Sequence, residues 1–398
     1  MKETYCNFPK INIQRGFPPN TEMIMENFTR KYISEIKLKD QIFIDSSTIE
    51  QVKNVTKVMY KGFIKEIRCT GQIFNLESPR NQLFFAIRKE MRDYCRKKYG
   101  KINVKVLEEN IELINSNQLK KGDMLLIPKL EQKKNNFKLI TKDFINTFSN
   151  YIKITIPETI NFTKELFRWF GYYLAEGMVL FTSNKRYEIK CRGVSFTVNI
   201  KEKNLVKEIM CTGEKIFGVK AKLIEIIERN AYRINFYNTQ LGELIFNLFN
   251  TGSSKKKIHS YLMLAPLDLL NELIHGWLKG DGWICNKRGT FTGNTTSIEL
   301  VKQIYLILIN LGELPTIGLA AHKNQNRKKA RELGYYLRHN LYNIRLLKNK
   351  NRSHRKQNRK YIFSPILYTN YKFYEGYIYT LEMRGGNSFI ANYILVNA

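Results

Sequence analysis

Two acidic residues occupy the same place in two similar segments. Residues 169–177 read WFGYYLAEG and residues 274–282 read IHGWLKGDG, so Glu176 and Asp281 each precede a glycine at a constant offset of 105. Paired carboxylates can bind hard divalent cations such as Mg2+, which prefer oxygen ligands. A bound cation of this kind lowers the pKa of a water and stabilises the leaving oxygen in phosphodiester hydrolysis. The repeat therefore predicts a hydrolytic site in which Glu176 and Asp281 hold Mg2+ or Mn2+.

The repeated segments are expected to be helices that pack closely on each other. Small residues recur four positions apart in both segments, at Gly171, Ala175, Gly276 and Gly280. Residues at i and i+4 share one face of a helix, and a helical glycine costs about 1 kcal/mol relative to alanine. Close packing through these faces would explain the glycines and would bring Glu176 and Asp281 together at the C-terminal ends. A cation would relieve both their repulsion and the unfavourable helix dipole.

The similarity continues beyond the acids. A strand-like run at 194–197 and an amphipathic run at 201–217 follow Glu176, and the runs 291–293 and 297–312 follow Asp281. Two copies of one helix–strand–helix unit imply an α+β domain with pseudo-twofold symmetry.

The flanking parts of the chain have the pattern of short strands separated by turns. This pattern covers roughly 16–140 and returns near the C-terminus. The expected fold is an α+β pseudo-twofold domain inserted in an all-β domain. We expect a leader or a remnant of a flanking host sequence (an extein remnant) at 1–15, a discontinuous β domain at 16–140 plus 361–398, and the α+β domain at 141–360.

The charge of the chain favours a polyanionic partner. The 66 Lys and Arg residues outnumber the 35 Asp and Glu residues, for a net charge of +31. Between 321 and 360 there are 14 basic residues and one acid, Glu332. Such a stretch suits a nucleic-acid backbone, although a solvated loop of a Lys-rich protein has the same composition. The candidate DNA-contacting residues are Lys257, Lys328, Lys329, Arg345, Arg355, Lys356 and Arg359.

The cysteines and the apolar runs indicate an intracellular protein without a structural zinc site. None of the six cysteines forms a CxxC pair, and the five histidines do not cluster with them. No segment resembles a signal peptide or is long enough to span a membrane. We therefore expect reduced thiols, no membrane contact, and a cytoplasmic location, or a nuclear one in a eukaryote.

The paired motifs resemble those of the LAGLIDADG homing endonucleases. The resemblance implies that Glu176 and Asp281 bind metal beneath two saddle-shaped sheets, and that double-stranded DNA is cut to leave short 3′ overhangs. It also implies a monomer, since one chain carries both motifs. The family has a lysine in a Lys-x-Ile-Pro segment before the second motif, and the segment here reads Lys256-Lys257-Ile258-His259. Lys256 is therefore the candidate for stabilising charge at the phosphate, with Lys257 second.

The outer segments resemble an intein, a protein-splicing element of the Hint fold. Residues 16–21 match an intein start and residues 387–392 a C-terminal block. Splicing needs a nucleophile at the first position and an asparagine that cyclises at the last. The positions where splicing residues belong instead hold Gly16, Asn81, Thr380, Asn387, Asn397 and Ala398. The resemblance therefore implies a Hint domain that does not splice.

Several alternatives share this fold. An RNA maturase or a catalytically inactive DNA-binding protein would have the same architecture, but retention of both acids favours the endonuclease. The losses at the splicing positions fit natural decay, and an engineered splice-inactive precursor is the competing explanation.

Overall fold

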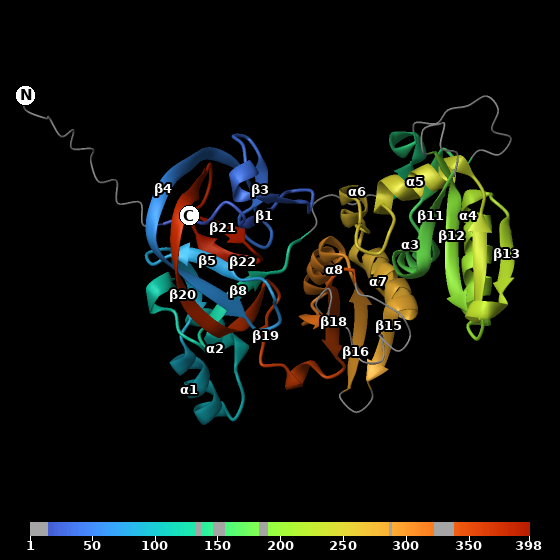
Figure 1. Ribbon diagram of the computed structural model, residues 1–398. Helices are drawn as coiled ribbons and strands as arrows, with labels where there is room; N and C mark the ends of the chain where they lie inside the picture. The colour runs from blue at the N-terminus through green and yellow to red at the C-terminus, as the bar shows by residue number, and fades with distance from the viewer. Residues whose placement is uncertain (1–14, 132–136, 146–155, 183–189, 286–288, 322–337) are drawn as a thin grey trace, which may run out of the picture. The chain divides into compact units, whose positions relative to one another are not determined.

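The protein folds into two units that are described separately here. The computed structural model describes residues 15–131, 137–145, 156–182, 190–285, 289–321 and 338–398. The first unit combines residues 1–130 with 354–398, and the second contains residues 131–353. Both contain antiparallel sheets, and the second also contains the longer helices (Figure 1).

The second unit begins at residue 131 instead of the expected 141, and it ends at residue 353 instead of the expected 360. Strand β9 (Lys138–Ile140) pairs with β10 (Thr159–Asn161) and so belongs to the second unit. Strand β19 (Lys356–Gln357) pairs with β20 (Tyr361–Met383), and the Lys129 ammonium donates to the Asn358 carbonyl at 2.6 Å. These pairings explain the shift of each boundary.

The first unit is built around two long strands. Strand β4 (Ile49–Cys69) pairs antiparallel with β20 along most of their lengths. The sheet runs in the order β2-β1-β21-β22-β6-β8-β20-β4-β3. The remaining strands are β1 (Glu22–Ile24), β2 (Arg30–Tyr32), β3 (Gln41–Phe43), β5 (Leu76–Pro79), β6 (Leu83–Ile87), β7 (Glu112–Asn115), β8 (Met124–Pro128), β21 (Ser388–Ala391) and β22 (Ile394–Asn397). Two helices, α1 (Lys89–Tyr99) and α2 (Val104–Glu109), connect β6 to β7.

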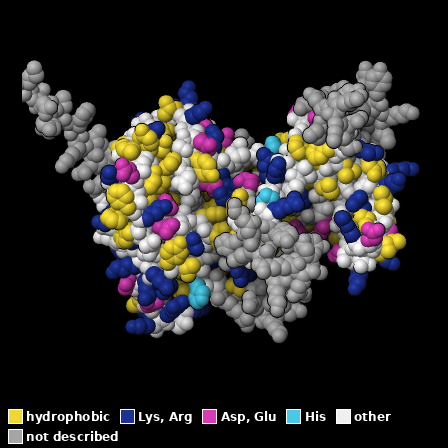
Figure 2. All heavy atoms as spheres, viewed as in Figure 1, with side chains coloured by type: hydrophobic (Ala, Val, Ile, Leu, Met, Phe, Trp, Pro, Cys, Tyr) yellow, Lys and Arg dark blue, Asp and Glu magenta, His cyan; other side chains and the backbone are white. Residues whose placement is uncertain are grey.

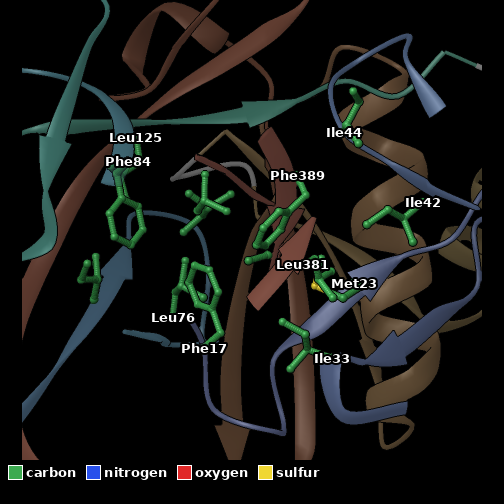
Figure 3. Packing of buried hydrophobic residues seen from close by; sticks show 14 of the residues in the cluster. Phe17, Met23, Ile33, Ile42, Ile44, Leu76, Phe84, Leu125, Leu381 and Phe389 are labelled. Atoms are coloured by element: carbon green, nitrogen blue, oxygen red, sulfur yellow. The ribbon is translucent and has the colours of Figure 1, made fainter. Parts of the chain in front are cut away.

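Residues from both ends of the chain share the core of this unit. Phe17 and Phe389 are buried and meet edge to face, with ring centroids 5.7 Å apart (Figure 3). Leu76, Phe84 and Leu381 belong to the same cluster. The burial of this apolar surface stabilises the unit and brings its two chain segments into one β domain.

The second unit contains two sheets of the same topology. Their orders are β11-β12-β14-β13 and β15-β16-β18-β17. The strands are β11 (Gly177–Phe181), β12 (Cys191–Asn199), β13 (Ala221–Ile226), β14 (Ala231–Phe236), β15 (Gly282–Cys285), β16 (Thr290–Thr295), β17 (Thr316–Ala321) and β18 (Leu341–Leu347). In each half a helix precedes the first strand and another joins the second strand to the third. The repeat in the sequence therefore corresponds to a repeat in the fold.

The helices of the second unit lie against the sheets. Helices α3 (Lys164–Glu176) and α7 (Leu267–Asp281) occupy equivalent places, as do α4 (Lys203–Phe217) and α8 (Ile298–Asn310). Helix α5 (Thr239–Phe249) and the short α6 (Ser260–Met263) follow the first sheet. Trp169 of α3 is buried and packs on Phe196 and Phe236 of the first sheet, with centroids 4.9 and 5.9 Å away. The aromatic residues of α3 thus fix that helix on its sheet.

No helix among the described residues is long and apolar enough to cross a membrane.

Candidate metal-dependent active site

Helix α3 has clear start and end signals. The Thr163 hydroxyl accepts a hydrogen bond from the backbone N–H of Leu166 at 3.2 Å and caps the first turn. The helix ends at Glu176, where the N–H of Gly177 bonds to the Tyr173 carbonyl. Helix α7 ends at Asp281, and the glycine that follows each helix begins a strand. Both acids therefore stand at the junction of a helix and the first strand of a sheet.

The glycines lie where the backbones of α3 and α7 touch. A Cβ atom on Gly171 would be 2.2 Å from the Leu273 carbonyl oxygen, and one on Gly276 would be 2.2 Å from that of Arg168. Real Cβ atoms do not approach so closely. The two helices are therefore in contact through backbone that only glycine leaves uncovered. Figure 1 shows α3 and α7 next to each other.

The acids meet at the C-terminal ends of this helix pair. A Cβ on Gly280 would lie 2.5 Å from the Cβ of Ala175 and 3.7 Å from a carboxylate oxygen of Glu176. Gly280 immediately precedes Asp281. Glu176 and Asp281 are thus neighbours across the α3–α7 contact.

Burial changes the protonation of both carboxyl groups. It raises the pKa of Glu176 to about 7, with the charge of Asp281 adding to the shift and that of Lys256 opposing it. Burial also raises the pKa of Asp281 to about 6, against the opposing effect of Lys256. Perturbed carboxyl groups of this kind are typical of functional sites.

Lys256 forms a buried cap on helix α3. Its ammonium donates to the carbonyls of Tyr173, Leu174 and Ala175 at 2.9, 2.9 and 3.2 Å. The residue is 5% exposed. Burial lowers the pKa of this ammonium to about 8, while the charges of Asp281 and Glu176 oppose that shift. Because an ammonium has three protons, these contacts use its full donor capacity.

The segment around Lys256 is anchored to the second half of the unit. The Lys256 carbonyl accepts from the Ser297 hydroxyl at 2.6 Å. The side chain of Gln303 pairs with both backbone groups of Ile258, at 2.7 and 2.6 Å. One buried segment therefore joins the end of α3 to helix α8. The neighbouring Lys257 is exposed and lies outside this network.

The two carboxylates suit a hard cation. Oxygen donors are the ligands that Mg2+ and Mn2+ prefer, and the pair concentrates negative charge at one partly buried point. No group of three or more His, Cys, Asp or Glu residues that could hold a metal occurs in the described ranges. A cation held by Glu176 and Asp281 would therefore need further oxygen ligands from other sources, such as backbone carbonyls, water or substrate.

Each sheet has a face on the side away from its helix that carries both polar and apolar side chains. Phe196 packs on α3, so its neighbours Ser195 and Thr197 point to the opposite face. Ser195 pairs with Met178 and Asn235 across the sheet. In the second sheet Thr292 pairs in the same manner with Trp283 and Arg345. The two sheets therefore carry different side chains at equivalent positions.

The predicted DNA-contacting residues are found in different places. Arg345 is on the helix-free face of the second sheet. Lys328 and Lys329 lie outside the described residues. Arg355, Lys356 and Arg359 belong to the first unit, not to the α+β unit expected from the sequence. Arg355 is 2% exposed, which removes its guanidinium from the surface and from the set of DNA contacts that we propose.

Gln82, which the sequence did not single out, contacts two of the expected splicing positions, Gly16 and Asn397. The side chain of Gln82 accepts from the N–H of Gly16 at 2.8 Å and donates to the Asn397 carbonyl at 2.6 Å. The Asn387 carbonyl accepts from the backbone of Ala398 and the side chain of Asn397, at 2.8 and 2.6 Å. Gln82 directly follows Asn81, one of the expected splicing positions, but nothing in its local sequence predicts that it bridges the two ends of the domain.

Gly16 leaves no room for a side chain. Its φ of +127° is unfavourable for other residues, and a Cβ would lie 2.7 Å from the Tyr379 carbonyl oxygen and 3.3 Å from Thr380. A cysteine at this position would require the backbone to move. Asn81 lies in the turn between β5 and β6.

Comparison with known proteins gives distant similarities only. No known family model matches the chain. It is 23% identical to an uncharacterized protein of Methanocaldococcus jannaschii, over 94% of this chain and 49% of that protein. It is 22% identical to the ATP-dependent DNA helicase Hel308 of Thermococcus kodakarensis, over 96% of this chain and 36% of the helicase. The chain thus spans half or less of the length of these curated relatives.

Two solved structures are each similar to less than half of the chain. The homing endonuclease I-DmoI in complex with DNA and Mn matches 48% of this chain and 93% of its own, with 15% identity and a TM-score of 0.35. The gp41-1 intein matches 28% of this chain and 68% of its own, with 16% identity and a TM-score of 0.19. Neither similarity is high enough to establish a family.

Proposed function

We propose that the chain is a metal-dependent, site-specific double-strand DNA endonuclease of the LAGLIDADG type. One observation carries the proposal. Two acids, Glu176 and Asp281, adjoin at the ends of helices packed backbone to backbone, and each acid directly precedes the first strand of its own sheet. Two unrelated surface acids would not both be the last residue of equivalent helices, and burial would not raise the pKa values of both.

In this proposal the two carboxylates hold the catalytic cations. When bound, Mg2+ would activate a water and stabilise the leaving oxygen of the phosphodiester. Glu176 and Asp281 would bind and orient the ions in their charged forms. Lys256 would hold the last turn of α3, and hence Glu176, in place while its charge offsets that of the two acids.

The helix-free faces of the two sheets are the proposed DNA-reading surfaces. A β-ribbon fits the major groove, where arginine pairs with guanine and asparagine with adenine. Asn235 and Arg345 are equivalent residues on these faces. Arg345 is exposed and can reach a base directly, whereas Asn235 is 3% exposed and would have to turn outward to do so. Different residues at equivalent positions favour an asymmetric target.

For the first unit we propose a Hint-like domain without splicing activity. The support is the absence of a nucleophile at Gly16, together with the bridge that Gln82 forms to Asn397. The α+β unit would then be an insertion in this domain.

The test is cleavage of fragmented genomic DNA from the source organism in Mg2+ or Mn2+, with the ends mapped by sequencing. We expect one recurrent cut site with 3′ overhangs, lost in Glu176→Gln and in Asp281→Asn. Glu165→Gln, on the exposed first turn of the same helix, should cut as the natural protein does. Tight DNA binding without cleavage in either metal would contradict the endonuclease and support a maturase or an inactive binder.

A further inference from the structure

The long two-stranded ribbon formed by β4 and β20 of the first unit has one exposed aromatic face. Strands β4 and β20 pair without a register shift from Tyr368 opposite Arg68 to Glu382 opposite Asn54. Side chains alternate between the two faces of such a ribbon. On one face Ile64 and Ile378 are almost completely buried. We call the other the ribbon face; it carries Lys57, Met59, Lys61, Phe63, Tyr371, Phe373, Glu375 and Tyr377, with Arg80 stacked on it.

The apolar side chains of the ribbon face are unusually open to solvent. Phe63 and Phe373 are opposite each other, with ring centroids 5.8 Å apart at 83°, and are 49% and 56% exposed. Met59 opposite Tyr377 is 59% exposed. A contiguous exposed patch of this kind marks an interaction surface. Figure 2 shows hydrophobic side chains interspersed with basic ones over the part of the protein that contains β4.

Cations contact the exposed rings directly. The Lys57 ammonium lies 3.9 Å from the ring centroid of Tyr377. The Arg80 guanidinium lies 5.8 Å from that of Phe63 and 5.5 Å from that of Tyr371. The acid on this face, Glu375, is paired with Lys61 at 3.1 Å. The ribbon face therefore combines flat apolar surfaces with an excess of positive charge.

We propose that the ribbon face binds single-stranded nucleic acid. Unpaired bases stack on aromatic side chains, and the phosphates between them pair with lysine and arginine. A duplex keeps its base faces inside the stack, and an acidic peptide has no regular series of planar groups. From Tyr371 to Tyr377 the strand rises about 20 Å, enough for several nucleotides. This inference does not depend on the proposed cleavage activity, because it uses a different unit and a different kind of ligand.

The proposal can be tested on the full chain with fluorescein-labelled oligothymidylate and oligouridylate. The variant Phe63→Ser/Phe373→Ser removes two exposed rings from the ribbon face. Tyr94→Ser/Tyr99→Ser removes two rings from α1 that are 46% and 41% exposed and serves as the matched control. Thermal unfolding of each variant checks that the fold is retained.

We expect the ribbon variant to bind at least about tenfold more weakly, since each stacked base contributes about 1–3 kcal/mol. The control variant should bind like the natural protein. Photo-crosslinking of a bromodeoxyuridine oligonucleotide should label the peptides that contain Phe63 and Phe373. The two probes show whether RNA or DNA is preferred.

Two results would overturn the inference. One is unchanged affinity in the ribbon variant with crosslinks confined to residues 131–353. The other is unchanged affinity with loss of a concentration-dependent self-association, measured by sedimentation, which would assign the ribbon face to protein contacts. Duplex cleavage, assayed separately with Glu176→Gln, can succeed or fail independently of either result.

Discussion

At the scale of single residues, three charged groups share one partly buried point. Glu176 and Asp281 have raised pKa values because burial penalises their charged forms, and the pKa of Lys256 is lowered for the same reason. One ammonium cannot neutralise two carboxylates, so a negative charge remains when both acids are ionised. A proton can compensate for it at low pH, and a divalent cation at higher pH.

Removing the charge of Glu176 should stabilise the metal-free protein at alkaline pH. Its pKa of about 7 in the folded state lies above the ordinary value of 4.5, so the folded protein binds this proton more tightly than the unfolded chain does. Stability therefore falls as the pH rises from 4.5 to 7. In EDTA at pH 8, Glu176→Gln should increase the free energy of unfolding by about 1–2 kcal/mol.

Urea denaturation at pH 5 and pH 8 measures this effect. Glu165→Gln is the control because hydrogen bonding at the start of α3 lowers the pKa of Glu165. The control should therefore give no stabilisation at pH 8. A Glu176→Gln protein that is less stable than the natural one at pH 8 would show that the ionised Glu176 carboxylate does not destabilise the folded protein.

Replacing Lys256 should be far more damaging than replacing its neighbour. Lys256→Met leaves the last carbonyls of α3 without a donor and leaves two buried acids without a cation, which should destabilise the protein by about 2–4 kcal/mol. Lys257→Met removes an exposed charge and should change stability by less than about 0.5 kcal/mol. Thermal denaturation of both variants checks this, and equal effects would contradict the capping role.

At the scale of elements, the contact between α3 and α7 determines the site. The helices approach so closely at Gly171 and Gly276 that their backbones touch. The chain ends of both helices, and therefore both acids, are positioned by this contact. Arg168 adds a second connection through its ion pair with Glu272 of α7, at 2.5 Å.

A single methyl group should separate the two helices. Gly276→Ala places a carbon 2.2 Å from the Arg168 carbonyl in the present geometry, and relief of the overlap should destabilise the protein by about 1–3 kcal/mol. Metal-dependent cleavage should fall more than stability does, because the acids move apart. His275→Ala, at the adjacent exposed position of α7, is the control. Full cleavage activity of Gly276→Ala would show that cleavage does not require Glu176 and Asp281 to lie next to each other.

At the scale of the whole molecule, the chain contains two separately stabilised units. The cluster around Phe17 and Phe389 belongs to the first, and that around Trp169 to the second. A unit with its own core should fold by itself. The fragment 131–353 should therefore unfold cooperatively in urea and retain its helical circular dichroism, and a fragment without a cooperative transition would contradict this division.

The sequence alone was enough to predict the repeat and the pair of acids. The spacing of Gly171, Glu176, Gly276 and Asp281 is local within each helix, and a helix converts such spacing directly into a face and an end. The alternation of strand and helix after each acid likewise predicted two copies of one unit, and the family resemblance implied the two sheets. Local periodicity carries this information because each element is formed mainly from neighbouring residues.

Other features were decided only by the tertiary structure. Arg355 is one of a run of basic residues, yet it is buried, and Lys256 points to the carbonyls of α3. Gln82 forms hydrogen bonds to Gly16, which is 66 residues earlier in the chain, and to Asn397, which is 315 residues later. No local pattern specifies such contacts, because they depend on where distant segments return in space. The sequence identified which residues could do chemistry, and the packing of distant segments determined the direction in which each of them points.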